Sequence, residues 1–516
     1  MTTLIPREPY TKEELQKLYP KNLELQLVQV FLRHGERTPI SARFQNTGLH
    51  PYWPYCSFAK KLIAVASSNS DLSTWDDFRW RRKFERFGDN DEAVVAVGPE
   101  GEGEGICHPG ELTDRGRQTT LALGQRLRHL YVDQLGFMPS VISNADHMYL
   151  RTTPVPRALE SLQQVFWGMY PPNARTSDFS MPAIITRTMP EETLYPNESS
   201  CRRFRQLARL FAQRAADRWN DSQDMSYLTS LWGKWMPENS PRVAVDSRPR
   251  LSGILDTINS TLAHGPATKL PPEFYDTKAH EIADRITTEE WFAGYKEDKE
   301  YRKLGIGALM GDVVDRMVNA SVNNGWRPAT DNAQVASPPV KFAISGCHDT
   351  TIASILASLG AFDEKWPRYT SNIAIELFKD NRAPNPQAGD ILEELSNPVP
   401  DNTEQKPSLF SRLLGRSSAP SRSIPPTSAQ TGRTPLSNLP QATHKHYVRI
   451  RYNDKPVRIP GCAEKKANHL PGDETFCTLE AFKEIVDKFT PKNWREECEW
   501  NLDQGMFVEG EGKAGY

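Results

Sequence analysis

The sequence lacks features that mark several classes of protein. Seven of its 516 residues are cysteines, and no two of them form a C-x-x-C pair, so neither a disulfide scaffold nor a zinc-binding cysteine cluster is expected. With 63 basic and 65 acidic residues the formal net charge is −2, which gives no overall electrostatic reason to expect a nucleic-acid partner. No stretch approaches the about 18 consecutive apolar residues of a transmembrane helix. We therefore expect a protein with no nucleic-acid partner and no transmembrane segment.

The amino terminus has no recognisable secretory signal. Its first ten residues, MTTLIPREPY, contain no apolar segment of the length that such signals use. The odd number of cysteines leaves at least one of them as a free thiol. These observations predict an intracellular protein with reduced cysteines, located in the cytoplasm or in a mitochondrion.

Hydrophobic patterning indicates strands that alternate with helices. Alternating or continuous apolar runs predict strands at residues 23–32, 140–143 and 339–345, and three- and four-residue spacing predicts helices at residues 114–131, 155–169 and 350–359. Such alternation is typical of an α/β fold with a mainly parallel central sheet flanked by helices. Ligand sites in these folds lie beyond the carboxyl ends of the strands.

The chain is longer than the about 250–300 residues at which a single core stops growing, so we expect insertions into a core. Residues 46–104 and 172–299 are interpreted as cap or insertion segments, the second of them mostly helical. Residues 381–445 are rich in Pro and Ser and poor in aromatics, which predicts a disordered insertion. The remaining segments, residues 20–45, 105–171, 300–380 and 446–500, would form a discontinuous α/β core.

The first motif that indicates chemistry is RHGERTP at residues 33–39, directly after a predicted strand. It places the guanidinium groups of Arg33 and Arg37 and the imidazole of His34 around one turn. Each arginine fork can hold two phosphate oxygens, and Gly35 lets the backbone approach an anion closely. From average residue usage, R-H-G-x-R-x-P should arise by chance in only about one chain in ten thousand of this length. A merely solvated basic turn therefore explains the motif poorly.

The second motif is CHD at residues 347–349, at a predicted strand-to-helix turn. Taken alone, Asp349 would be interpreted as a structural residue at the start of a helix. The first motif changes that interpretation, because His34 and His348 both follow strands whose carboxyl ends should meet at one edge of the sheet.

These segments resemble the histidine acid phosphatases, branch 2 of the histidine phosphatase superfamily. Residues 33–39 resemble the family's nucleophile motif, and His348 with Asp349 resembles its His-Asp pair. Residues 151–161, RTTPVPRALES, resemble the stretch that supplies a further phosphate-binding arginine, which places that role on Arg157. This stretch is more similar to the lysophosphatidic acid phosphatases than to the phytases. Other segments that resemble the family are residues 110–118, 460–462, 476–479 and 494–498.

The resemblance implies a metal-independent acid phosphatase that hydrolyses phosphate monoesters through a phosphohistidine at His34. Asp349 would protonate the leaving oxygen and then help to activate water. The phosphate-binding residues would be Arg33, Arg37, Arg157 and His348. No metal and no cofactor are expected, and because an aspartic acid is a useful acid only while protonated, the rate should be highest at acidic pH.

The expected partner is a small-molecule phosphate monoester, with lysophosphatidic acid as one candidate; the sequence does not predict an oligomeric state. A phytase-like inositol phosphate phosphatase is the alternative enzyme. A non-catalytic phosphate-binding pseudoenzyme would require loss of His34 or Asp349, and both are present. Aromatic and basic residues in segments 50–56 and 75–84 could line a lysophospholipid pocket, or could simply pack beneath a solvated basic helix.

Overall fold

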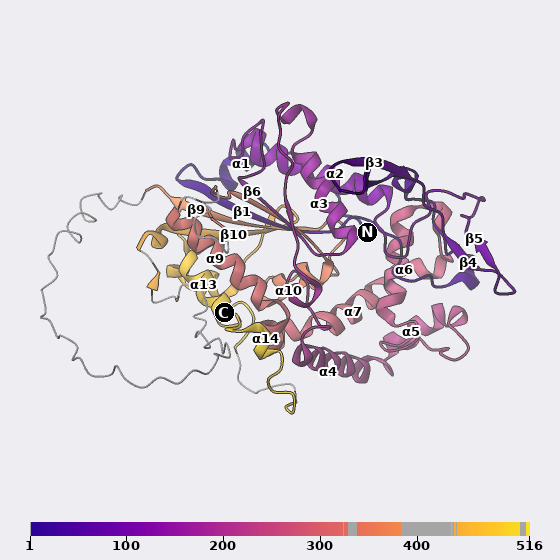
Figure 1. Cartoon of the computed structure of the whole chain (residues 1–516). Helices are drawn as coiled ribbons and strands as arrows, with labels where there is room; N and C mark the ends of the chain where they lie inside the picture. Colours follow the sequence, from indigo (N-terminus) through magenta and orange to yellow (C-terminus); the bar gives the residue numbers. More distant parts are fainter. Residues whose placement is uncertain are drawn as a thin grey trace, which may run out of the picture.

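The computed structural model describes residues 2–323, 325–328, 338–382, 435, 438–439, 441–505 and 512–516. The segment predicted to be disordered, residues 381–445, falls for the most part outside these described residues. A central sheet lies among helices, and further helices are grouped to one side of it (Figure 1). The predicted α/β class, with its helical cap and helix-flanked sheet, is confirmed.

The central sheet has nine strands. Eight of them follow the order β12-β13-β10-β9-β1-β8-β6-β7, and β11 pairs with β10. Strands β1, β8, β6 and β7 are mutually parallel, whereas the pairings from β1 through β9 to β12 are antiparallel. The bounds are β1 Leu23–Arg33, β6 Met148–Thr152, β7 Ile184–Ile185, β8 Phe342–Cys347, β9 Asn372–Asp380, β10 His446–Tyr452, β11 Lys455–Pro456, β12 His469–Leu470 and β13 Asp473–Thr478.

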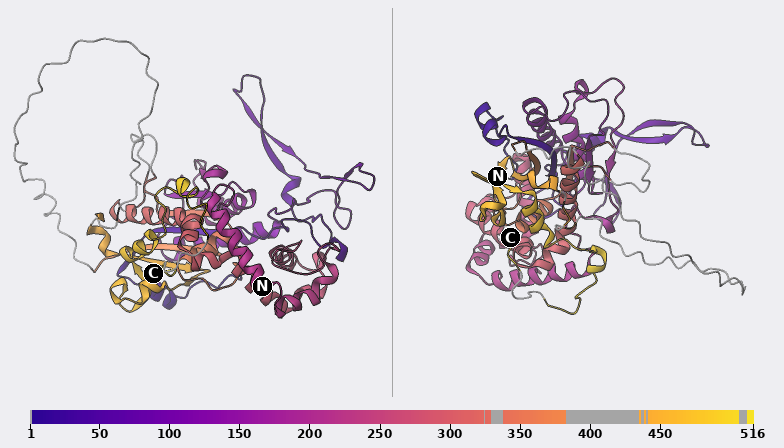
Figure 2. Two further views of the ribbon diagram at one scale, coloured as in Figure 1. Left: turned by 90° about the horizontal axis from the view of Figure 1, so that it is seen from below. Right: turned by 90° about the vertical axis from the view of Figure 1, so that its left-hand side faces the viewer.

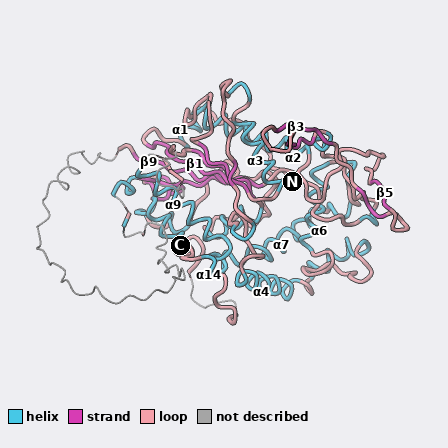
Figure 3. Tube along the Cα trace, in the orientation of Figure 1, coloured by secondary structure: helices cyan, strands magenta, loops and turns pink. Residues whose placement is uncertain are grey.

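Alternating side chains of β1 supply two separate cores, as the period of a strand requires. Val28 and Leu32 pack with α2 (Asp114–Arg128) and α3 (Pro156–Met169). Leu27 and Phe31 pack with α9 (Ala308–Asn323), α10 (Asp349–Ser358) and α13 (Leu479–Asp487). Figure 3 shows the strands in magenta among these helices in cyan. The β1 strand is therefore buried on both faces, which explains its continuous apolar run.

The helices predicted at residues 114–131, 155–169 and 350–359 are confirmed as α2, α3 and α10. The strand predicted at residues 140–143 is wrong, since Ile142 forms only an isolated bridge to Arg175 and the strand in this part of the sheet is β6. Polar residues obscured β6 in the sequence. One of them, Arg151, is buried because it pairs with Glu192 at 2.7 Å.

The helical cap has its own core, formed by buried side chains of α5, α6 and α7 together with Phe44 and Trp53. Two short hairpins, β2–β3 and β4–β5, extend outside the body of the molecule (Figure 2). The bounds of these and the remaining elements are α1 Lys12–Leu18, β2 Leu62–Ser67, β3 Trp75–Trp80, β4 Glu85–Phe87, β5 Ala93–Val95, α4 Arg202–Trp219, α5 Gln223–Trp232, α6 Leu251–His264, α7 Thr277–Glu297, α8 Lys299–Arg302, α12 Pro460–Ala463 and α14 Trp494–Glu497.

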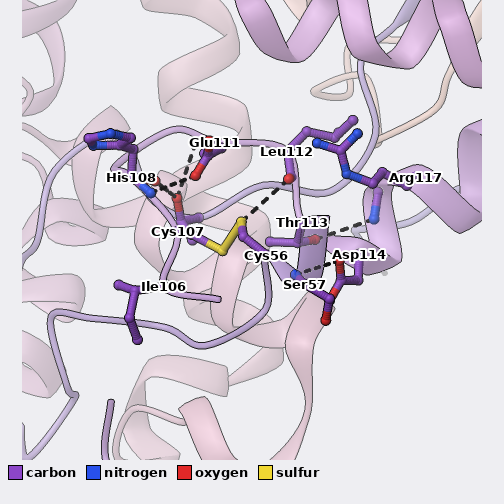
Figure 4. The surroundings of a disulfide bond; sticks show 12 residues. Cys56, Ser57, Ile106, Cys107, His108, Glu111, Leu112, Thr113, Asp114 and Arg117 are labelled. Atoms are coloured by element: carbon purple, nitrogen blue, oxygen red, sulfur yellow. Dashed lines mark hydrogen bonds between the residues drawn. A yellow bond between two sulfur atoms is a disulfide. The ribbon is translucent and has the colours of Figure 1, made fainter. Parts of the chain in front are cut away.

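The expectation of reduced cysteines is wrong. Three disulfides join Cys56 to Cys107, Cys201 to Cys498 and Cys462 to Cys477, and Cys347 is a buried free thiol. The paired cysteines lie 51, 297 and 15 residues apart, so spacing could not reveal them. Figure 4 shows the first bridge next to the start of α2. Among the described residues, no helix is long and apolar enough to cross a membrane.

Candidate active site

The six residues singled out in the sequence converge on one cavity of about 540 Å³. Parallel pairing aligns Arg33 at the end of β1 with Cys347 at the end of β8, which brings the two motifs together. The segment of residues 151–161 runs from the end of β6 into α3, and Arg157 lies in the first turn of α3. All six predicted site residues line this cavity, namely Arg33, His34, Arg37, Arg157, His348 and Asp349.

His34 is oriented by its own turn. Its Nδ1 lies 2.9 Å from the carbonyl oxygen of Gly35, and because a carbonyl only accepts, this hydrogen bond requires the proton on Nδ1. The lone pair then resides on Nε2. Burial, followed by the positive charges of Arg157, Arg33 and Arg37, holds the pKa of His34 well below its usual range. His34 is therefore a neutral imidazole with a free nitrogen lone pair.

Three arginines place positive charge around His34. Arg33 pairs with Asp349 at 2.7 Å, and Arg37 pairs with Asp256 at 2.8 Å. Burial and the nearby charge of Arg37 lower the pKa of Arg157 to about 10. The Nε groups of all three are buried and have no hydrogen-bond partner among the described residues. A bound anion in the cavity that these three guanidinium groups line would offset the repulsion among their positive charges.

Asp349 is held as a carboxylate. Its Oδ2 accepts hydrogen bonds from Arg33 at 2.7 Å and from Trp366 Nε1 at 2.9 Å, and its Oδ1 accepts from the backbone N–H of Thr350 at 2.9 Å. Burial acts to raise the pKa of Asp349, but the charge of Arg33 and the bond from Trp366 outweigh it, and the pKa is lowered. The carboxyl is thus ionised in the absence of substrate.

His348 lies close to His34, with ring centroids 5.7 Å apart. Its Nε2 contacts Thr153 Oγ1 at 3.1 Å. Burial and then the charge of Arg157 lower the pKa of His348, so the ring is neutral. A neutral His348 can donate a hydrogen bond to a phosphate oxygen but brings no charge.

The structure requires glycine at position 35 for close packing of the backbone, whereas the sequence suggested a role in the approach of the backbone to an anion. A Cβ at this position would lie 2.3 Å from the carbonyl oxygen of Gly116, and one at Gly116 would lie 2.2 Å from the carbonyl oxygen of Glu36. The two glycines let the turn after β1 touch the first turn of α2. They therefore fix the position of His34 through backbone packing.

Sequence reasoning missed several residues that line the cavity. Ser252, Asp256 and Asn259 lie on one side of α6, and their four- and three-residue spacing was the available signal. The aromatic lining residues come from the cap and from the loop after α10 and carry no helical spacing signal. They are Tyr195, Trp291, Trp366 and Tyr369.

The predicted aromatic wall at residues 50–56 and 75–84 is wrong, because none of these residues lines the cavity. Trp53 is buried in the cap core. Trp75, Phe78 and Trp80 are exposed on the β2–β3 hairpin, so the alternative of packing beneath a basic helix is also wrong for this segment. The aromatic wall of the cavity is built instead from cap residues and from the loop after α10.

A fold with a strand-end histidine, a His-Asp pair and clustered arginines defines a phosphatase, and comparison with known proteins agrees. The profile of the family described as histidine phosphatase superfamily (branch 2) matches residues 24–388. The chain belongs to this family of phosphatases.

Individual members of the family and solved structures are also similar to this chain. It is 36% identical to a probable acid phosphatase of Schizosaccharomyces pombe over 480 residues, covering 93% of this chain and 95% of that protein. It is 26% identical to the lysophosphatidic acid phosphatase type 6 of Homo sapiens over 367 residues, covering 69% and 74%. The Hafnia alvei phytase shares the fold, with a TM-score of 0.52 at 13% identity over 93% of this chain and 99% of that one.

Proposed function

We propose that the protein hydrolyses phosphate monoesters in two steps through a phosphohistidine on His34. The observation that carries the proposal is the shared cavity, which is lined by a neutral His34 with its lone pair on Nε2 and by Arg33, Arg37 and Arg157. Phosphoryl transfer depends on positioning and on neutralising the phosphoryl oxygens. Arg33, Arg37 and Arg157 supply this charge, and His348 supplies a hydrogen bond.

In the first step His34 Nε2 forms a bond to phosphorus as the ester P–O bond breaks, and protonated Asp349 gives its proton to the leaving oxygen. In the second step the Asp349 carboxylate takes a proton from water, the water oxygen bonds to phosphorus, and the P–N bond breaks. A bound phosphate competes with Asp349 for Arg33 and adds negative charge nearby. Both effects raise the pKa of Asp349, which lets it carry the proton.

The direct experiment is phosphate release from p-nitrophenyl phosphate at acidic pH. His34→Ala should abolish it. Asp349→Asn should lower hydrolysis of an alkyl phosphate far more than of p-nitrophenyl phosphate, because nitrophenolate leaves without a proton. Wild-type rates in His34→Ala would refute the mechanism, and an inactive wild-type protein that binds phosphate would identify a pseudoenzyme.

For the substrate we propose a monoester with an apolar leaving group, of which lysophosphatidic acid is an example. The cavity wall beyond the phosphate-binding residues includes Ile40, Leu255 and Trp291. Among the described residues one further arginine lines the cavity, Arg43, and it contacts Asp256 at 3.4 Å. Inositol polyphosphates carry several phosphates and need additional free cations, so the phytase-like alternative has less support.

Relative kcat/KM values for lysophosphatidic acid, inositol hexakisphosphate and phosphotyrosine test this choice. We expect kcat/KM for lysophosphatidic acid to exceed that for inositol hexakisphosphate by at least about tenfold. A phosphate group held without a cation against the apolar wall of the cavity should cost more than about 1.4 kcal/mol, which corresponds to a tenfold difference. A preference for inositol hexakisphosphate would favour the phytase-like alternative and leave the His34 mechanism intact.

For the compartment we propose an oxidising environment in place of the expected cytoplasm or mitochondrion. The support is the set of three disulfides, which persist where thiols are not kept reduced. Mass spectrometry of the natively isolated protein after alkylation should show one modified cysteine, Cys347, only after unfolding. Seven modified cysteines would contradict the proposal.

A further inference from the structure

The β2–β3 hairpin carries large apolar side chains that nothing in the described chain covers. Ile63, Val65, Trp75, Phe78 and Trp80 are between 53% and 64% exposed. Cross-strand pairing places Phe78 and Trp80 with Ala64 and Leu62 on one face, and Trp75 with Ile63 and Val65 on the other. Exposed apolar clusters of this kind mark interaction surfaces.

The hairpin is anchored at its base and free along its length. The Cys56–Cys107 disulfide fixes the chain just before it (Figure 4), and Arg82 just after it pairs with Glu111 at 2.7 Å. Figure 2 shows the two strands extending away from the body. β3 pairs only with β2 among the described strands, so its outer edge has open backbone donors and acceptors. An isolated two-stranded hairpin is marginally stable in water and its edges invite a further strand.

The charged residues along β3 indicate which further strand would pair with its open edge. Asp76 and Asp77 lie toward the turn, Arg79 lies toward the base, and none of them has an ion-pair partner in the part of the chain that the structure describes. If β3 pairs antiparallel with β3 of a second copy, with Phe78 opposite Phe78, then Asp77 lies opposite Arg79 twice. Directly opposite side chains share a face, so both ion pairs form on the Trp75 face.

We propose that β3 is a self-pairing edge through which two copies of this chain form a symmetric dimer with a continuous four-stranded sheet. The interface is self-complementary, as a two-fold axis requires, and backbone hydrogen bonds supply affinity as in other strand additions. An anionic membrane fits less well. Asp71, Asp76 and Asp77 near the turn would be repelled by it and would be costly to bury.

Charge reversal tests the register directly. Asp77→Lys places Lys opposite Arg79, and Arg79→Glu places Glu opposite Asp77, so each variant should weaken dimerisation by about tenfold or more. The double variant Asp77→Lys/Arg79→Glu should dimerise as the wild type does. An equimolar mixture of the two single variants should form a heterodimer. The readout is sedimentation over an about hundredfold range of concentration.

Matched controls separate these effects from general changes in charge. Asp221→Lys and Arg242→Glu reverse an exposed ion pair of 3.0 Å in the cap and should not alter dimerisation. Phe78→Cys should link two copies through a disulfide under mild oxidation, whereas Leu72→Cys at the turn should not. Hydrolysis of p-nitrophenyl phosphate should be unchanged in all of these variants, which shows that they fold.

Three results would overturn the proposal. The first is a wild-type protein that remains monomeric at every concentration. The second is a double variant that dimerises no better than the single variants. The third is a monomeric wild type that binds vesicles of anionic lipid through the hairpin, which would assign this surface to a membrane.

Discussion

The indole Nε1 of Trp366 donates a hydrogen bond of 2.9 Å to Oδ2 of Asp349, the same oxygen that Arg33 holds at 2.7 Å. Two donors therefore stabilise the ionised form of the proposed acid. Trp366 also lines the cavity and packs against Phe292, with ring centroids 5.1 Å apart. The indole thus fixes the carboxylate from a rigid aromatic support.

Trp366→Phe should shift the pH dependence of alkyl phosphate hydrolysis toward higher pH. The substitution keeps an aromatic ring but removes a donor to the carboxylate, so the pKa of Asp349 rises and its protonated form persists at higher pH. A hydrogen bond to a charged group that is worth about 1.5 kcal/mol corresponds to a shift of about one pH unit. The measurement is kcat/KM against pH, with Trp291→Phe as the control in the same cavity. An unchanged profile would contradict a role of Trp366 in positioning the acid.

Arg37→Ala should lower kcat/KM by about 100-fold, the loss typical of removing one transition-state donor. It should also weaken inhibition by inorganic phosphate. Arg43 is the matched control, because it lines the same cavity and contacts the same carboxylate, Asp256. Arg43→Ala should change kcat/KM for p-nitrophenyl phosphate by less than about fivefold, since in our proposal it does not bind the phosphoryl group. Equal losses in both variants would show that Asp256, not phosphate, determines the effect.

Glu376 should make the fold sensitive to strong acid. This buried residue on β9 pairs with Arg449 at 2.8 Å and with Arg451 at 3.3 Å. Burial acts to raise its pKa, but the two arginines outweigh burial and lower it to about 2. A depressed folded-state pKa stabilises the fold above the unfolded value of about 4.3, and this contribution is lost as the pH falls toward 2.

Glu376→Gln should therefore lower the free energy of unfolding at pH 7 by about 3 kcal/mol, because it removes the buried carboxylate that pairs with both Arg449 and Arg451. As the pH falls below about 4.3 the difference from the wild type should shrink. Denaturant unfolding at pH 7 and at pH 3 checks both statements. The exposed pair of Arg458 and Glu474, 2.9 Å apart, provides the control, since Glu474→Gln should change stability by less than about 1 kcal/mol at either pH. A difference that grows as the pH falls would be inconsistent with this account of Glu376.

Local patterns predicted much of the core correctly. The run of apolar residues in β1 and the capped helix α2 were visible because burial and capping act over a few residues. β6 escaped notice because Arg151 pairs with Glu192, 41 residues away. The disulfide between Cys201 and Cys498 was hidden for the same reason, at a separation of 297 residues.

By itself the sequence determined the chemical groups of the site, because RHGERTP and CHD each lie within one turn and bring their own backbone geometry. Only the tertiary structure decided what surrounds those groups. The parallel pairing of β1 with β8 sets His34 beside His348, α6 brings Asp256 to Arg37, and Trp366 reaches Asp349 from beyond the end of α10. These contacts arise from packing between segments that are far apart in the sequence, and local residue spacing does not predict which of those segments pack together.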